Sequence, residues 1–166
     1  MTIKNISKLC FCLMAALVFT GDAHAAGLAQ AITDDTAIYA ITYTFTTEDY
    51  ELAVPVITER NLLTPSEPAK TGYTFTTSEG GDAHAGSATG LVLSNTQIKD
   101  GKYYVPKNTT ASFTLFVVLS LAENDPRAKY GLQMTTMPFT IIAKDSMTAQ
   151  NISTLGAYKT KEVGLN

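Results

Sequence analysis

The sequence predicts an all-β fold, an antiparallel β-sandwich of about seven short strands. Two observations support it. Segments in which apolar and polar residues alternate are separated by turn signals rich in Gly, Pro, Asn and Asp. In addition, helical periodicity is never sustained for longer than a turn or two after the first few dozen residues.

The first two strands are expected at residues 38–46 and 50–56. In residues 38–46, large apolar side chains alternate with alanine and threonine, as in a strand with one buried and one solvated face. The set expected to be buried is Tyr39, Ile41, Tyr43 and Phe45. In residues 50–56, Pro55 has no backbone N–H to donate, so that strand is expected to lie at a sheet edge or to end there.

A long connection is expected at residues 58–72, "TERNLLTPSEPAKTG", because it contains Pro65 and Pro68 and has no sustained periodicity. Strands are then expected in "GYTFTT" and, after a glycine-rich loop, in "GLVLS". Further on, Asp100-Gly101 is a dipeptide typical of two-residue hairpin turns, which predicts a hairpin around it.

The strongest strand pattern, "ASFTLFVVLSLA" at residues 111–122, predicts a central strand. One face is formed by Phe113, Leu115, Val117, Leu119 and Leu121. Because Phe116 and Val118 make the other face apolar as well, neighbours are expected on both sides. Two short strands follow within residues 129–142, with Pro138 marking a bulge or a crossover between sheets.

The N-terminus has the pattern of an export signal. Lys4 and Lys8 precede an uncharged apolar run at residues 9–19, and Ala23 and Ala25 occupy the positions that a signal peptidase reads. The run is shorter than the roughly 20 residues that span a bilayer, so no stable membrane insertion is expected after cleavage. We therefore predict a signal peptide at residues 1–25 and secretion to the exterior or the cell surface, with the periplasm as an open alternative.

The rest of the chain is divided into three parts. Residues 26–36 are interpreted as an N-terminal extension, for which a simple tail is preferred, and residues 37–145 as the sandwich domain. Residues 146–166 form a more polar C-terminal segment, either with a last strand near residues 156–163 or as a tail.

Signal cleavage restricts the chemistry left to the protein. It would remove both cysteines and one of the two histidines, leaving no disulfide and only His84, which lies in a stretch of Gly, Ala and Ser. Zinc and nucleophilic triads need more than one such residue on rigid supports, so no enzyme activity and no catalytic residue are predicted. A net charge of −3 without a basic stripe disfavours nucleic acid as a partner.

Two kinds of side chain remain as candidates for ligand contacts. Acidic side chains in turns are candidate calcium ligands, since calcium is held by clusters of oxygens. They are Glu48, Asp49, Glu123 and Asp125, although turn carboxylates are more often simply solvated. Tyr103 and Tyr104 are candidates for contact with a sugar or a protein partner, against the simpler reading of one tyrosine inward and one outward on a strand. No other cofactor is expected.

The chain also resembles a known family. The segments "AITYTFTTEDYELAVP", "GKYYVPKNTTASFTLFVVLS", "YGLQMTTMPFTI" and "LGAYKTKEVGLN" resemble an immunoglobulin-like β-sandwich domain found in secreted, poorly characterised bacterial surface proteins. The resemblance implies extracellular placement and a non-catalytic role, and it carries no catalytic residue across. The domain commonly forms the C-terminal region of such proteins, whereas this chain is expected to have no partner domain.

The expectation for function is therefore a secreted, non-catalytic, structural or adhesive protein of the cell surface, bound to a surface protein or a glycan. A carbohydrate- or calcium-dependent binding module is the alternative. A pilin-like filament subunit ranks third, because strands can add to exposed sheet edges and so permit self-assembly.

Overall fold

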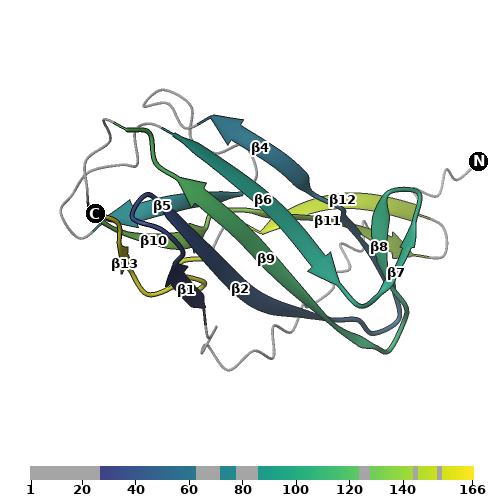
Figure 1. Ribbon diagram of the computed structural model, residues 1–166. Helices are drawn as coiled ribbons and strands as arrows, with labels where there is room; N and C mark the ends of the chain where they lie inside the picture. The colour runs from purple at the N-terminus through teal and green to yellow at the C-terminus, as the bar shows by residue number, and fades with distance from the viewer. Residues whose placement is uncertain (1–26, 63–71, 78–85, 124–127, 144–145, 153–154) are drawn as a thin grey trace, which may run out of the picture.

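The computed structural model describes residues 27–62, 72–77, 86–123, 128–143, 146–152 and 155–166. The expected signal peptide at residues 1–25, the His84 loop and Asp125 lie outside the described residues. Within them, the fold is all-β with antiparallel sheets, as the sequence predicts (Figure 1). No helix among the described residues is long and apolar enough to cross a membrane.

Thirteen strands are present in the described residues, more than the roughly seven expected. They are β1 (Leu28–Ala31), β2 (Thr36–Thr46), β3 (Glu51–Pro55), β4 (Thr58–Leu62), β5 (Tyr73–Thr77), β6 (Ser87–Ser94), β7 (Gln97–Lys99), β8 (Lys102–Val105), β9 (Thr110–Ser120), β10 (Lys129–Met134), β11 (Met137–Ala143), β12 (Ser146–Ile152) and β13 (Val163–Gly164). The sequence predicts fewer strands than the structure contains, because short strands with little apolar content do not stand out in it.

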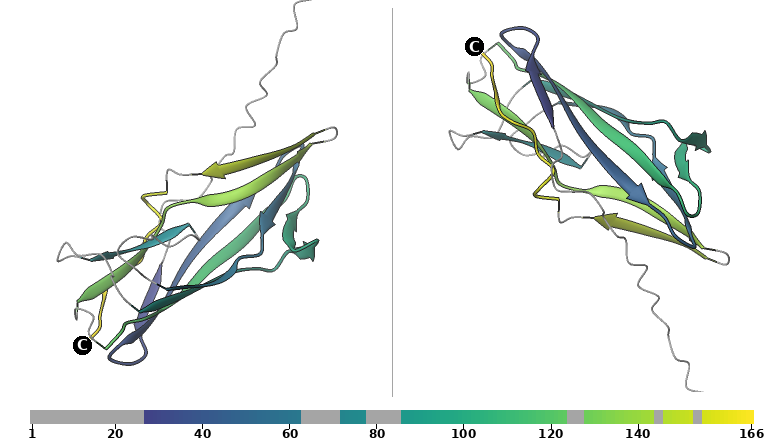
Figure 2. Two further views of the ribbon diagram at one scale, coloured as in Figure 1. Left: turned by 90° about the horizontal axis from the view of Figure 1, so that it is seen from above. Right: turned by 90° about the horizontal axis from the view of Figure 1, so that it is seen from below.

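The strands form three sheets. One has the order β1-β2-β9-β6-β4, a second the order β12-β11-β3-β8-β7, and a small third sheet the order β13-β10-β5. In Figure 2, the first sheet forms one layer, and β5, β10, β11 and β12 lie across from it. The chain passes from the small sheet to the second sheet between β10 and β11, and Pro138 is the second residue of β11, in agreement with the crossover prediction.

The core fills the space between these layers. The residues expected to be buried on β2 are indeed buried, and so are their partners on β9 (Phe113, Leu115, Val117). Aromatic rings connect the layers: Phe45 of β2 lies 5.5 Å from Phe139 of β11, measured between ring centroids. Burial of these large side chains provides most of the stability of the fold.

Two further strand predictions are confirmed. β9 is the middle strand of its sheet, paired with β2 on one side and β6 on the other. The hairpin of β7 and β8 turns at Asp100-Gly101, whose φ angles of 51° and 70° are the left-handed values that such turns need. β3 ends at Pro55, although it lies inside its sheet and not at the edge.

Other expectations were wrong. The expected connection at residues 58–72 begins with β4, an edge strand paired with β6, which its polar sequence "TERNL" conceals. The N-terminal extension is not a simple tail, because β1 pairs with β2 as a hairpin. Of the two alternatives for the C-terminal segment, a last strand and not a tail agrees with the structure, since the segment contributes β12, β13 and the buried Leu155 and Leu165.

Candidate binding surface

The outer face of the five-stranded sheet that contains β9 has a continuous row of apolar side chains. Residues that pair directly across antiparallel strands lie on the same face, about 4.5–5.5 Å apart. The register links Leu28 of β1 to Ala40 of β2, Ala40 to Phe116 of β9, and Phe116 to Leu91 of β6. The row therefore crosses four strands.

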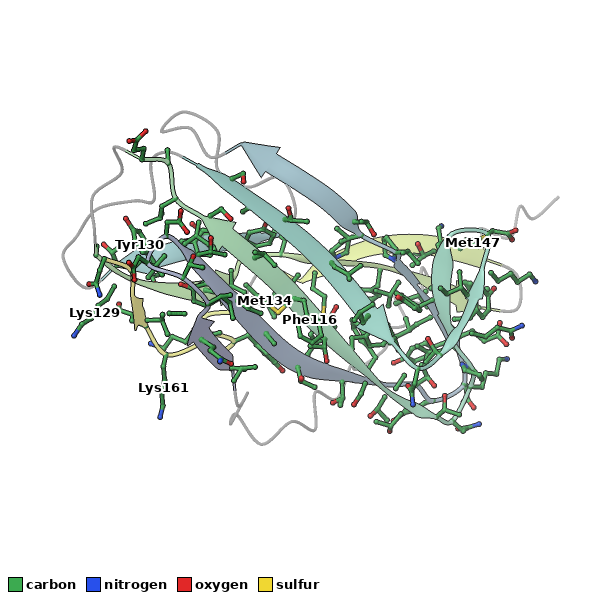
Figure 3. All side chains as sticks on the ribbon, in the orientation of Figure 1. Phe116, Lys129, Tyr130, Met134, Met147 and Lys161 are labelled. Carbon is green, nitrogen blue, oxygen red and sulfur yellow. The ribbon has the colours of Figure 1, made fainter. Side chains whose placement is uncertain are left out.

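Neighbouring residues widen this row. On one side, Ile38 pairs with Val118, and on the other, Leu93 pairs with Thr114. We call the whole set the outer patch: Leu28, Ile38, Ala40, Leu91, Leu93, Phe116 and Val118. Leu28 is 53% exposed and Leu93 42%, while Phe116, near the middle of β9 in Figure 3, is half-buried among its neighbours.

Hydroxyl groups flank the outer patch along β2 and β9. The side chains of Thr42 and Thr114 are joined by a 3.1 Å hydrogen bond, and those of Thr46 and Thr110 by one of 2.9 Å. These pairs hold the hydroxyl groups in fixed positions on the surface. None of the residues that β1, β2, β6 and β9 place on this face is charged.

An apolar centre with an aromatic side chain, bordered along β2 and β9 by uncharged hydroxyl groups, is the arrangement of many protein interaction surfaces. Because the outer patch crosses four strands, it suits a broad partner better than a small molecule. Between the layers, by contrast, a cavity lined by residues such as Tyr43, Leu115 and Met137 has a volume of only about 10 Å³. Such a volume holds at most about one water molecule.

The acidic candidates that the structure describes do not gather at one end of the sheet. Glu48 and Asp49 follow β2, next to Thr46 and its partner Thr110, whereas Glu123 follows the end of β9 where Ser120 pairs with Thr36. At about 3.3 Å per residue, the two ends of this ladder lie about 33 Å apart. Among the described residues, no group of three or more His, Cys, Asp or Glu side chains is placed to hold a metal ion.

The tyrosine candidates have different environments. Tyr103 is 4% exposed, its hydroxyl donates a 3.0 Å hydrogen bond to the carbonyl oxygen of Val92, and its ring packs edge-on against Phe113. It is therefore a core residue. Tyr104 is half-exposed, and the Nζ atom of Lys99 lies 5.7 Å from the centre of its ring. The structure therefore shows Tyr103 pointing inward and Tyr104 pointing outward on the same strand, as the simpler of the two interpretations predicts.

The sequence contains one signal for the outer patch. Phe116 and Val118 make the second face of their strand apolar, which correctly predicts that the strand is central. However, Ile38 and Ala40 continue the same apolar row on β2, and only the register of the sheet brings them beside Phe116. Leu28 belongs to a strand that the sequence did not predict.

Comparison with known protein families, with curated proteins and with solved structures finds no match to this chain.

Proposed function

We propose that this chain is a secreted, non-catalytic protein of the bacterial cell surface, built as an immunoglobulin-like β-sandwich, with a structural or adhesive role. The outer patch is the observation that carries the adhesive part of the proposal. The export pattern at residues 1–25 and the resemblance to bacterial surface domains support the location.

The partner is a surface protein or a glycan. Phe116 is the central contact because it lies in the middle of the row and is the only aromatic side chain among the outer-patch residues. Aromatic side chains at the centre of an interface commonly contribute the largest share of the binding energy. The hydroxyl groups of Thr42 and Thr114 lie one row away and supply polar contacts.

Replacement of Phe116 by serine tests this role. The measurement is the binding of the fluorescently labelled protein to intact cells of the strain that produces it. We expect the Phe116→Ser variant to bind at least about tenfold more weakly, the loss expected for an interface centre. Its melting temperature must stay close to that of the unchanged protein, so that weak binding is not a consequence of unfolding.

Ile98→Ser is the matched control, because Ile98 is an apolar residue of another sheet and is 55% exposed. This variant is expected to bind normally. Equal binding by the Phe116→Ser variant would remove the outer patch from the proposal, and equal loss in both variants would indicate nonspecific apolar adhesion.

A carbohydrate-dependent binding module is the second candidate, favoured by the aromatic ring of Phe116 beside the hydroxyl pair of Thr42 and Thr114. Sugars present apolar faces to aromatic rings and hydroxyl groups to polar neighbours. Competition of cell binding by soluble glycans distinguishes a glycan partner from a protein partner. Addition of a chelator in the same assay tests for the calcium dependence of the alternative.

A further inference from the structure

β12 forms an edge of its sheet, and within the part of the chain that the structure describes it pairs on one side only. All seven residues from Ser146 to Ile152 pair with β11, and no other described strand pairs with β12. In an antiparallel strand, the backbone N–H and C=O groups of alternate residues point away from the partner strand. The side of β12 that faces away from β11 therefore offers a row of backbone donors and acceptors with which no strand in the described ranges pairs.

The other sheet edges in the described part of the chain are protected in ways that natural proteins commonly use. At the start of β1, Gly27 is bridged to Thr160 of the C-terminal segment. β4 contains Glu59 and Arg60, and β7 is only three residues long and ends with Lys99. β13 has two residues, and every residue of β5 is buried or half-buried.

β12 lacks each of these protections. Its sequence "SMTAQNI" has no charged residue and no proline, and it is longer than the other edge strands. It is also accessible: Met147, labelled in Figure 3, is 68% exposed, and Thr148 is exposed. In Figure 2, β12 lies at the outer side of β11. A long, neutral, accessible edge is a template for pairing with another strand.

We propose that the partner of this edge is β12 of a second copy of the chain, paired antiparallel about a two-fold axis through Ala149. In this register, Met147 lies opposite Asn151 and Thr148 opposite Gln150, so that no two charges face each other along the strand. The two five-stranded sheets then join into one continuous sheet. Such a self-complementary contact is the usual basis of symmetric dimers.

This inference does not depend on the outer patch, which belongs to a different sheet. Its failure and the failure of the adhesive proposal are therefore distinguishable. A two-fold contact closes on itself, so it predicts a dimer and not an open filament.

Sedimentation equilibrium of the purified protein over a range of concentrations tests the proposal, with the unchanged protein expected to be a dimer. The test variant is Ala149→Lys, which places two like charges opposite each other at the axis. We expect it to weaken association by about tenfold or more, since facing like charges are strongly unfavourable in an interface. The matched control is Ile98→Lys, which introduces the same residue at the opposite edge of the same sheet. This variant is expected to stay dimeric.

The circular dichroism spectra of both variants must match that of the unchanged protein. If the Ala149→Lys variant is unfolded, the association of the Thr148→Pro variant is measured instead as a second test. A third test uses the unchanged protein, in which the backbone amides of β12 should exchange more slowly at high than at low protein concentration. A monomeric unchanged protein at every concentration would overturn the proposal. So would an Ala149→Lys variant that dimerises normally, or a filament in place of a dimer.

Discussion

The hydroxyl group of Tyr39 on β2 donates a 3.0 Å hydrogen bond to the backbone carbonyl oxygen of Tyr130 on β10. Both residues are buried, and their strands belong to different sheets. The ring of Tyr39 also packs edge-on against Phe75 of β5, with 5.6 Å between the ring centroids. One side chain therefore connects the large first sheet to the small third sheet.

Replacing Tyr39 by phenylalanine removes this hydrogen bond and keeps the ring. The free energy of unfolding is expected to fall by about 1–2 kcal/mol, because a buried polar group loses its partner. Urea denaturation measures the change. Tyr104→Phe is the control, since its half-exposed ring lies outside the core, and it is expected to change the stability by less than about 0.5 kcal/mol.

Alkaline pH is expected to destabilise the fold. Burial raises the pKa of Tyr39 and of Tyr43 well above the ordinary value of 10.0, and their neighbours Tyr130 and Tyr103 add to the effect. A phenol whose pKa is higher in the folded state contributes stability that is present below pH 10.0 and is lost as the pH rises above it. The urea midpoint should therefore be constant below that pH and fall above it.

Tyr43→Phe provides the check on this explanation, because it removes one of the buried phenols whose pKa is raised. The alkaline decrease of the urea midpoint should be smaller in this variant than in the unchanged protein. A decrease of the same size would assign the effect to other groups.

Two glycines with similar backbone angles are expected to differ in their tolerance of alanine. Gly101 has a φ of 70° and nothing within 4 Å of the position of an added Cβ atom, so Gly101→Ala should cost about 1 kcal/mol from the backbone alone. Gly72 has a φ of 78°, but an added Cβ would collide with the carbonyl oxygen of Thr136. Gly72→Ala should cost about 3 kcal/mol or more. Thermal melting of both variants compares the two losses, and similar losses would contradict the predicted difference.

The core between the layers is tested by a buried charge. Leu115 is 2% exposed, and Leu115→Asp is expected to prevent folding, since an unpaired buried charge costs several kcal/mol against a typical total stability of about 5–15 kcal/mol. Ser112→Asp on the exposed face of the same strand should fold normally. Far-ultraviolet circular dichroism and melting curves distinguish the two, and a cooperative, unchanged transition for Leu115→Asp would refute the arrangement.

The sequence predicted those parts of the fold in which local pattern and burial agree. β2 and β9 alternate strongly, and the hairpin at Asp100-Gly101 depends only on local turn chemistry. β1 and β4 were missed because their sequences are short or polar, and they are strands through their pairing with β2 and β6. Such edge strands are set by tertiary contacts that a local pattern does not contain.

The candidate site was less predictable for the same reason. The sequence could indicate that Phe116 has an apolar strand face around it, but not that Ala40, Leu91 and Leu28 lie in the same row. Conversely, Glu48 and Glu123 both occupy turns and looked compatible with one acidic site. The long ladder of β2 and β9 holds them at opposite ends.

The central claim is that the outer face of the five-stranded sheet is displayed outside the cell. Labelling of intact producing cells with a membrane-impermeant maleimide tests it most directly, with Leu93→Cys as the probe, because Leu93 is 42% exposed on that face. Leu115→Cys, in the core, and the unchanged chain are the controls. We predict that only the Leu93→Cys protein is labelled, without lysis. Labelling of Leu93→Cys only after lysis would contradict the claim.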